Sequence, residues 1–344
     1  MKQPGTDITA LFRCLLLGVA CDLPAARKTS VFWSYSANLG CSRCFQNFSH
    51  GFAMRNCYDK FDRDSWEMRT NNRHRSDVKK ILKCTTKTER SRKESEFGCR
   101  YSALLDLPYF RPVEMLLIDP MHNLFLRTAK HFARNLWIGR NILDTTALAK
   151  IEERLRNMVV PTGLGRLPVS INMGCFLTAD QWKNWTIYFS MYYLGDLLPQ
   201  PQHECWRHFV LACRRLCKLS ITKDDITIAD ALLLRFCKRT VQLYGSEAIT
   251  PNMHMHCHLA SCMREFGPIH SFWLFPFERY NGILEGQPTN NCSVELQLML
   301  PFQKDNMHLH LHHEAKQWPN ADHFLDALPD SSYDIHLLSC LMSV

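Results

Sequence analysis

Two pairs of potential metal ligands, separated by most of the chain, constrain this sequence more than any other feature. Cys41 and Cys44 follow Gly40 with Cys-x-x-Cys spacing. His254 and His258 are four positions apart and would therefore share one face of a helix. Two thiolates and two imidazoles form a ligand set typical of tetrahedral zinc. The sequence therefore predicts that the two segments meet around one zinc ion, although unrelated buried thiols and ordinary helical histidines would leave the same pattern.

A carboxylate accompanies each ligand pair. Asp22 ends an apolar, strand-like run nineteen residues before the cysteine pair, and Pro24 stops that run. Glu278 follows the histidine pair by twenty residues, between aromatic residues, where an ionised group needs a partner such as Arg279 or a bound cation. If zinc joins the two segments, Asp22 and Glu278 become neighbours that could hold magnesium. A loop-capping role is the alternative for Asp22.

Asp119 is the rival of Glu278 as the second carboxylate. It ends the apolar run of residues 109–119 and stands directly before Pro120. An aspartate at the N-cap followed by proline at the first helical position predicts a helix that continues through Leu124 to Phe132. His122, in the first turn of that helix, could face the same crevice. This capping role explains Asp119 sufficiently, so we rank it second.

Residues 175–245 have apolar side chains at helical spacing and predict a block of successive helices. Thr178 and Thr227 are the expected N-caps, and Gly245 is the expected C-cap. Pro251 should open the helix that carries the histidine pair, with His256 facing away from the metal. The aromatic residues of this block are expected to serve packing.

Residues 45–100 are polar and poor in periodic apolar positions, which predicts an exposed or partly mobile insertion. Its cationic side chains could contact a phosphate backbone. A merely solvated surface is the commoner explanation, and nearby glutamates dilute the charge. The candidate nucleic-acid-binding residues are Lys79, Lys80, Lys83, Lys87, Arg90, Arg92 and Lys93.

Composition limits the class of protein. With 344 residues, 46% hydrophobic and 22% charged, the chain is globular rather than disordered. A net charge of +8 permits a polyanionic partner. No apolar run is long enough to span a membrane, and the run of residues 11–20, interrupted by Arg13, is better read as a buried strand or helix than as a signal peptide. Sixteen cysteines in so long a chain favour metal binding in a reducing, intracellular compartment.

Three blocks of the sequence together resemble the transposases of CACTA (En/Spm-type) DNA transposons. They read CDLPAARKTSVFWSYSANLGCSRC, LLIDPMHNLFLRTAKHF and ITPNMHMHCHLASCMREFGPIHSFWLFPFERYNGIL, and they span roughly residues 10–300. The resemblance implies a ribonuclease-H-like core with three catalytic acids, a helical insertion and a zinc site. Asp22 then matches the second acid and Glu278 the third, while the cysteine and histidine pairs match the zinc ligands.

The resemblance gives a fold class of α/β plus α: a partial ribonuclease-H-like core with a large helical insertion, joined by zinc. We expect residues 1–44 to be a remnant of that core, 45–100 a basic polar insertion, 101–250 a mainly helical insertion, 251–300 the C-terminal part of the core, and 301–344 a tail. The first acid of such a core should lie well upstream of Asp22. Because Asp7 is the only acid there, the resemblance implies a copy truncated at its N-terminus.

In intact relatives, the resemblance implies DNA cleavage and strand transfer with two magnesium or manganese ions held by the acids. Activity should be impaired here because the first acid is missing. The implied partners are transposon ends and target DNA, with a homo-oligomer allowed, no membrane, and the nucleus as the location. The alternatives are a non-catalytic, zinc-stabilised DNA- or protein-binding remnant and an unrelated helical interaction protein.

Overall fold

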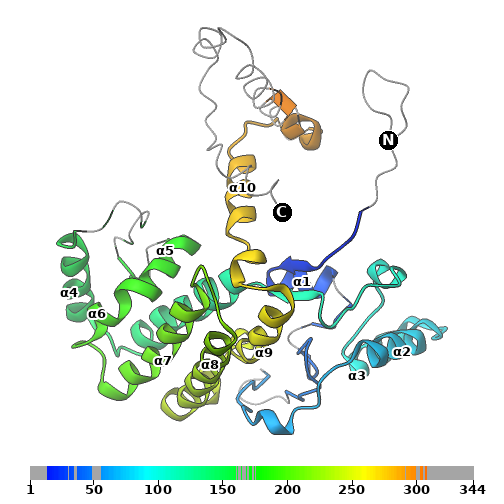
Figure 1. Cartoon of the computed structure of the whole chain (residues 1–344), viewed down its shortest axis with the longest axis horizontal. Helices are drawn as coiled ribbons and strands as arrows, with labels where there is room; N and C mark the ends of the chain where they lie inside the picture. Colours follow the sequence, from blue (N-terminus) through cyan, green and yellow to red (C-terminus); the bar gives the residue numbers. More distant parts are fainter. Residues whose placement is uncertain are drawn as a thin grey trace. The chain divides into compact units, whose positions relative to one another are not determined.

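Helices dominate the computed structural model of the chain (Figure 1). The described residues are 14–29, 31–34, 37–48, 56–159, 161, 164, 168, 170–172, 174, 176–290, 292–299, 303–304 and 307. The chain divides into two compact units, Met1–Phe275 and Pro276–Val344. Among the described helices, none has the length and apolar character that crossing a membrane requires.

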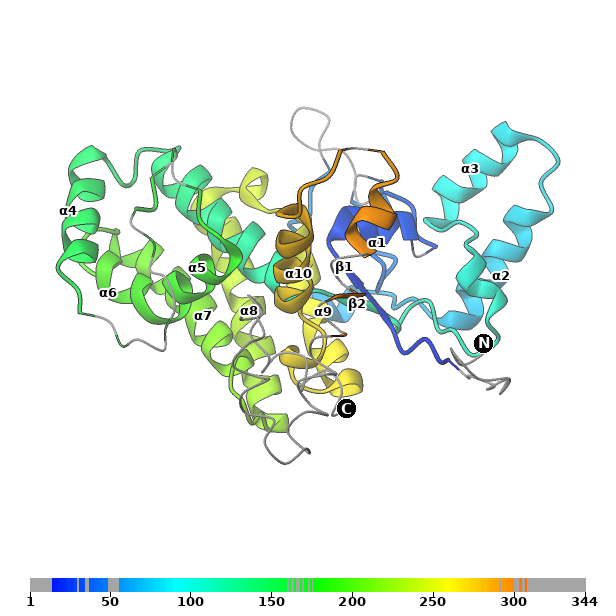
Figure 2. The same cartoon turned by 90° about the horizontal axis from the view of Figure 1, so that it is seen from above.

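Two short parallel strands form the sheet of the first unit. β1 (Val19–Cys21) pairs with β2 (Leu116–Ile118), and Cys21 is in register with Ile118. The strands lie side by side in Figure 2. Asp22 and Asp119 are therefore the next residues after two paired strands, at the same edge of the sheet. The expected strand ending at Asp22 is confirmed, and helix α1 (Leu23–Thr29) follows it directly.

The apolar run before Asp22 is less buried than its composition predicts. Only Val19–Cys21 is a strand, and these residues are half-buried. Leu15 and Leu17 are 64% and 70% exposed. The expectation of a buried strand or helix over residues 11–20 is therefore wrong for residues 14–18, and within the described part of the run only Val19 and Ala20 belong to a strand. Residues 11–13 lie outside the described part.

The described residues between 31 and 44 form no continuous strand. The described part of this segment makes only isolated antiparallel bridges, from Phe32 to Cys99 and from Cys44 to Met68. Its carbonyl groups are taken by a side chain instead, because Arg69 binds the backbone oxygens of Leu39, Cys41 and Cys44. A two-stranded sheet in the described residues does not establish a ribonuclease-H-like core.

The helical block of the first unit packs around buried aromatic rings. Helices α7, α8 and α9 lie side by side (Figure 1). This confirms the successive helices and the packing role of the aromatic residues. The helices are η4 (Met121–Ala129) and η5 (Phe132–Ile138), both of π type, α4 (Thr145–Arg156), α5 (Ala179–Asn184), the π-helix η7 (Trp185–Phe189), α6 (Ser190–Leu194), α7 (Gln200–Leu216), α8 (Lys223–Tyr244) and α9 (Pro251–Phe266). The largest fully buried side chains in this block include Trp137, Trp182, Trp185, Trp206, Tyr193, Phe132, Phe209 and Phe236.

Helix ends follow local capping chemistry. Thr178 caps α5 in a capping box with Gln181, as expected. Gly245, at φ +83°, ends α8 as expected. Thr227 is not the cap of α8, because the helix begins four residues earlier, at Lys223, after Thr222. Thr222 forms its own capping box there, which satisfies the first free N–H groups and fixes the earlier start.

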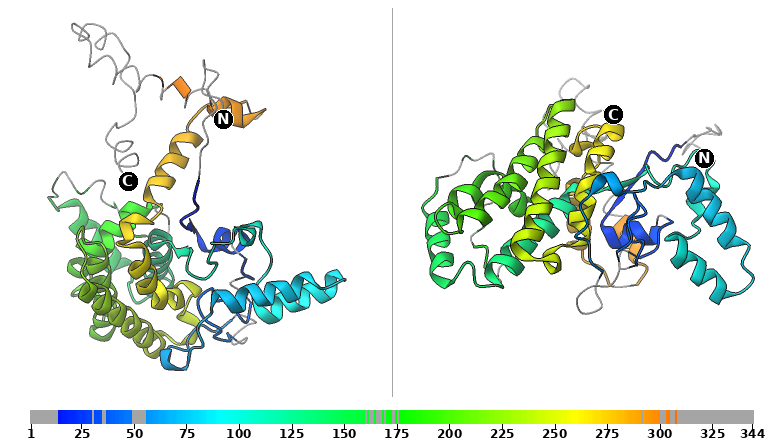
Figure 3. Two further views of the ribbon diagram at one scale, coloured as in Figure 1. Left: turned by 45° about the vertical axis from the view of Figure 1, so that its right-hand side comes forward. Right: turned by 90° about the horizontal axis from the view of Figure 1, so that it is seen from below.

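Residues 56–100 contain two helices rather than an irregular insertion. α2 (Asn71–Leu82) is capped by Thr70, and α3 (Lys87–Phe97) is capped by Thr86 and ends at Gly98, at φ +64°. In both views of Figure 3 these helices extend away from the α4–α8 block. α2 buries Val78 and Ile81, whereas α3 buries none of its side chains. These helices were not recognised in the sequence because they lack a long apolar stripe and are stabilised by threonine caps and ion pairs.

The remaining elements are short. They are the 3₁₀ turns η2 (Arg63–Ser65), η3 (Ala103–Asp106), η8 (Ser246–Ala248) and η9 (Ile269–Ser271), together with helix α10 (Phe275–Glu285), most of which belongs to the second unit. The histidine-rich stretch of residues 307–313 lies outside the described part except for Met307.

We predict that His74 makes the fold sensitive to acid. Its two ring nitrogens are buried without hydrogen-bond partners in the described part, and burial, followed by Arg69 and Arg75, lowers its pKa to about 3. Because an unfolded histidine has a pKa of about 6.5, the unfolded chain binds the proton first. The neutral ring therefore contributes its full stability above about pH 6.5 and progressively less toward pH 3.

His74→Leu should accordingly lose less thermal stability than the unchanged protein between about pH 7 and pH 4. Thermal unfolding followed by circular dichroism at several pH values measures this difference. An equal acid loss in both proteins would contradict the assignment to His74.

Candidate metal centre

The two ligand pairs meet in the first unit. The Sγ atoms of Cys41 and Cys44 and the ring nitrogens of His254 and His258 all lie within 4.8 Å of one another, and all four residues are buried. One pair comes from the turn after α1 and the other from α9. The convergence expected from the sequence is confirmed.

The distances fit one tetrahedral ion. Cys41 Sγ lies 3.5 Å from His258 Nε2, Cys44 Sγ lies 3.4 Å from His254 Nε2, and the two Nε2 atoms are 3.3 Å apart. A tetrahedron with zinc–sulfur bonds of about 2.3 Å and zinc–nitrogen bonds of about 2.0–2.1 Å has S···N edges of about 3.6 Å and N···N edges of about 3.3 Å. These three distances are close to the edges of such a tetrahedron, so the cluster could bind zinc.

Helix α9 directs its histidines to two different places. Pro251 stands at the start of the helix. From there His254 and His258, one turn apart, present their Nε2 atoms to the cysteines. His256 points elsewhere, as expected, and its Nε2 lies 3.1 Å from Thr128 Oγ1. Burial lowers the pKa of His256 to about 3, so this ring is neutral and belongs to the core.

An aromatic wall encloses the imidazoles. The ring of Trp66 lies 4.6 Å from that of His254 and 5.2 Å from that of His258, and Phe48 lies 4.8 Å from His254. All of these side chains are buried. Water is therefore kept from the cluster, as in a closed structural metal site.

The thiols are prepared for metal binding by their surroundings. Burial opposes ionisation of Cys41, but the Cys44 thiol and the rings of His258 and His254 lower its pKa well below the ordinary value. The backbone N–H of Arg43 donates to Cys41 Sγ at 3.2 Å, which also favours the thiolate. The pKa of Cys44 is raised by the adjacent Cys41 and by burial. Metal ions bind thiolates, so binding of an ion here would release the protons that the two thiols hold.

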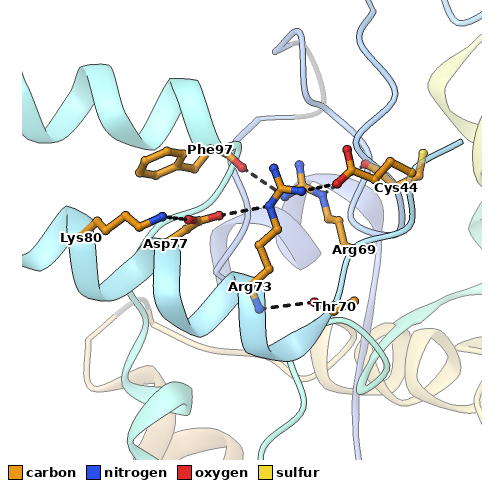
Figure 4. A network of polar contacts seen from close by, with 8 residues as sticks. Cys44, Arg69, Thr70, Arg73, Asp77, Lys80 and Phe97 are labelled. Atoms are coloured by element: carbon orange, nitrogen blue, oxygen red, sulfur yellow. Dashed lines mark hydrogen bonds and ion pairs between the residues drawn. The ribbon is translucent and has the colours of Figure 1, made fainter.

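Arg69 holds the cysteine turn in shape. Its Nε donates to the carbonyl oxygens of Cys41 at 2.9 Å and Cys44 at 3.2 Å. Its Nη1 donates to Phe97 O at 3.1 Å and its Nη2 to Leu39 O at 3.2 Å. The side chain is only 5% exposed, and burial lowers its pKa. One guanidinium thus joins the turn to the end of α3 (Figure 4).

A second group of charges continues this network along α2 (Figure 4). Asp77 is buried and pairs with Lys80 Nζ at 2.8 Å and with Arg73 Nε at 3.8 Å. The Thr70 hydroxyl accepts the N–H of Arg73 at 3.3 Å and caps the helix. Since α2 begins two residues after Arg69, this anchoring also fixes the residue that supports the metal turn.

Arg43, between the two cysteines, is a further supporting residue. It is buried, and its Nη2 donates to Leu116 O at 2.8 Å and lies 2.9 Å from Cys262 Sγ. It therefore ties the metal turn to β2 and to α9. Arg27 is buried beside the same turn and donates to Gly40 O.

Sequence reasoning missed Arg27, Arg43 and Arg69. The position of Arg43 inside the Cys-x-x-Cys spacing was a usable signal. An arginine in a turn is, however, ordinarily exposed.

The acids at the sheet edge both have structural roles. An Asp22 carboxylate oxygen accepts the N–H of Ala25 at 2.8 Å and caps α1. Asp119 is 3% exposed, and its oxygens accept the N–H groups of Met121 at 3.2 Å, His122 at 2.8 Å and Leu274 at 3.0 Å. The Nδ1 atom of His122 is 2.6 Å from Asp119 Oδ2. The expected capping role of Asp119 is confirmed.

A small cavity lies at this edge. Cys21, Asp119, His122 and Asn252 are among the residues that line it, and its volume is about 30 Å³. That space suits a water molecule or an ion rather than a substrate.

Glu278 lies in the first turn of α10, in the second unit, and its side chain is exposed. Phe277 next to it is also exposed, by 60%, so Glu278 does not lie in an apolar environment on this side. Asp22 belongs to the first unit and Glu278 to the second, so their pairing around magnesium stays a prediction.

The seven candidate nucleic-acid-binding cations lie on α2, on α3 and in the turn between them. Several are paired with acids. Lys80 pairs with Asp77 at 2.8 Å, Arg90 with Glu94 at 3.2 Å and Lys93 with Glu89 at 3.6 Å. Lys79, Lys83, Lys87 and Arg92 complete the set, which stays a prediction.

Comparisons with protein-family models, with curated proteins and with solved structures find no match for this chain. The candidate site therefore depends on its own geometry.

We predict that the purified protein contains one zinc ion per chain and that Cys41→Ser and His258→Ala lose it, because each substitution removes a ligand from a closed site. Both should also unfold at lower temperature, since metal binding contributes folding free energy. Elemental analysis and thermal unfolding measure these effects. The matched control is His256→Ala on the same helix, which should retain zinc. Full zinc content in His258→Ala would contradict the assigned ligand set.

We predict that Arg69→Lys weakens zinc affinity by roughly 10–100-fold, because loss of an outer partner loosens the ligands. Lysine keeps the charge but cannot bind four carbonyl oxygens at once. Competition with a chromogenic chelator measures the affinity. Arg73→Lys, in the same network but away from the carbonyls of the turn, should change it little. Equal affinities in all three proteins would show that Arg69 does not support the site.

Proposed function

We propose that this chain is a transposase-derived protein that acts on DNA, with a structural zinc ion at its centre. The observation that carries the proposal is the meeting of the cysteine pair with the histidine pair across the intervening helices. The order of features along this chain resembles that of CACTA-type transposases. It is an acid, a thiol pair, a helical block, an imidazole pair and a second acid. Convergence of four ligand atoms supports reading that order as one site.

Zinc would have a structural role. All four positions of the tetrahedron are filled by protein side chains, which leaves none for a substrate or a water molecule. The ion would link the turn after α1 to α9. Its binding free energy would stabilise the first unit rather than act on a substrate.

The sheet edge supports a role in DNA chemistry. Asp22 and Asp119 follow two parallel strands, and ligands of open α/β sheets bind beyond such carboxyl ends. Magnesium or manganese ions bound by carboxylates would activate water and a 3′ hydroxyl for attack on phosphodiesters. Asp22 and Glu278 are the residues proposed to hold them, in a nuclear and oligomeric protein.

A non-catalytic, zinc-stabilised DNA-binding remnant is the second candidate. It is favoured by the hydrogen bonds of the two acids at the sheet edge. Asp22 caps α1, and Asp119 already accepts three backbone N–H groups and contacts His122. Carboxylates engaged in this way would lose structural contacts on turning toward a metal ion.

We predict weak magnesium- or manganese-dependent nicking of supercoiled plasmid DNA, impaired by the missing first acid, that is abolished in Glu278→Gln and Asp22→Asn. Each substitution removes a negative oxygen that a catalytic ion needs. The matched control is Glu265→Gln, which neutralises another exposed acid, near the end of α9, and should leave nicking unchanged. Gel analysis of nicked and linear plasmid gives the rates.

The outcomes separate the two candidates. Nicking that persists in Glu278→Gln excludes Glu278 from the site. A protein that contains zinc and binds DNA but nicks nothing is the non-catalytic remnant. A protein that neither contains zinc nor binds DNA rules out both.

A further inference from the structure

A cleft of about 380 Å³ opens in the first unit beside the start of α1. Its walls come from three segments: Leu23 and Pro24 of α1, one face of η4 with the residues that follow it, and Thr250 at the start of α9. That volume is within the range of sites that bind small ligands or parts of larger ones. The cleft lies within the same unit as the metal cluster and does not involve its ligands.

Two cations dominate this cleft. Arg127, in η4, and Lys130, directly after it, both line the cleft. No aspartate or glutamate lines the described walls of the cleft. Burial, followed by the positive charges of Arg134 and Arg127, lowers the pKa of Lys130. The folded chain thus holds the positive charges of Arg127 and Lys130 close together, and no carboxylate of the described lining separates them. A bound anion would reduce the repulsion between these two charges.

His131 and Arg134 lie near the two cations but are not expected to bind an anion in the cleft, which leaves Arg127 and Lys130 as the binding residues. His131 Nε2 lies 2.9 Å from Ala248 O, and burial lowers the pKa of this histidine, so its ring is a neutral part of the wall. The Arg134 guanidinium lies over the Trp182 ring at 5.9 Å and is not part of the lining.

Thr250 adds a neutral donor to the same cleft. Its hydroxyl oxygen is buried without a hydrogen-bond partner in the described part of the chain. A hydroxyl in this setting is able to donate to an anionic oxygen.

We infer that this cleft binds a phosphate group of the DNA backbone and holds the DNA beside the strand edge that carries Asp22. Leu23 and Pro24, in the cleft wall, follow Asp22 directly in the chain. Arginine and lysine are the residues that most often contact backbone phosphates, and such contacts position a protein on DNA without reading its sequence. The inference rests on the proposed function, because it takes DNA as the source of the phosphate.

The experiment compares the double variant Arg127→Gln/Lys130→Gln with a matched control, Arg235→Gln/Lys238→Gln. The control pair has the same Arg-x-x-Lys spacing and lies exposed on α8. Both variants lose the same net charge. Binding of a short fluorescein-labelled duplex is measured by anisotropy with the full chain, in calcium instead of magnesium, over a series of salt concentrations. Zinc content and thermal unfolding confirm that each variant is folded.

We expect the cleft variant to bind DNA roughly 10–100-fold more weakly at moderate salt, with a log–log salt slope reduced by about two. The control should keep most of its affinity and slope. The charge-preserving variant Arg127→Lys/Lys130→Arg should bind nearly as well as the unchanged protein.

Three results would overturn the inference. Equal losses in the cleft variant and the control would show a general effect of net charge and would leave the proposed DNA function standing. Loss of inorganic phosphate binding in calorimetry, with DNA affinity unchanged, would identify a site for a free anion. No DNA binding by the unchanged protein would remove both this inference and the proposed function.

Discussion

The first unit depends on a contact between two buried thiols and two buried imidazoles from opposite ends of its chain. The cysteine turn makes few strand bonds, and its carbonyl oxygens are bound mainly by guanidinium groups. The helices from η4 to α8 are packed around their own aromatic core. The S···N and N···N distances already have the lengths that one tetrahedral ion would impose. The candidate metal site therefore joins a weakly paired segment to a well-packed one.

Around this cluster, buried arginine side chains bind backbone carbonyl groups that strand pairing would bind in a larger sheet. Arg69 joins the metal turn to the end of α3, and Arg43 joins it to β2. Each of these guanidinium groups has several donors in a fixed plane, so one side chain satisfies several carbonyl groups at once. An irregular turn can therefore be held rigidly enough to present two thiols in a defined geometry. Rigidity of this kind is what a metal site needs from its outer contacts.

The sequence predicted the meeting of the four candidate metal ligands better than it predicted the fold around them. Ligand spacing is a local property with a direct geometric meaning, so Cys-x-x-Cys and His-x-x-x-His could be combined before any tertiary contact was known. The helix after Pro120 and the start of α9 were likewise predictable from proline and capping signals. The helices α2 and α3 were missed because their composition is polar, and their stability comes from threonine caps and ion pairs.

The proposed acid pair could not be judged from the sequence in the same way. The exposure of Glu278 depends on which face of α10 it occupies, and spacing from the histidine pair does not determine that face. The role of Asp22 was left between a cap and a metal ligand, and the bond to Ala25 shows that it is at least a cap. Neither residue type nor spacing distinguishes these roles, because both place a carboxylate at the end of a strand.

Both carboxylate oxygens of Asp119 accept hydrogen bonds, which limits the residues that could replace it. Its two oxygens face three backbone N–H groups and one imidazole, so only a group that accepts at both atoms suits the position. Even an isosteric amide would direct an NH₂ group at another donor. Replacing Asp119 should therefore cost folding stability whether or not it takes part in catalysis, so a loss of function on its replacement would not identify a catalytic acid.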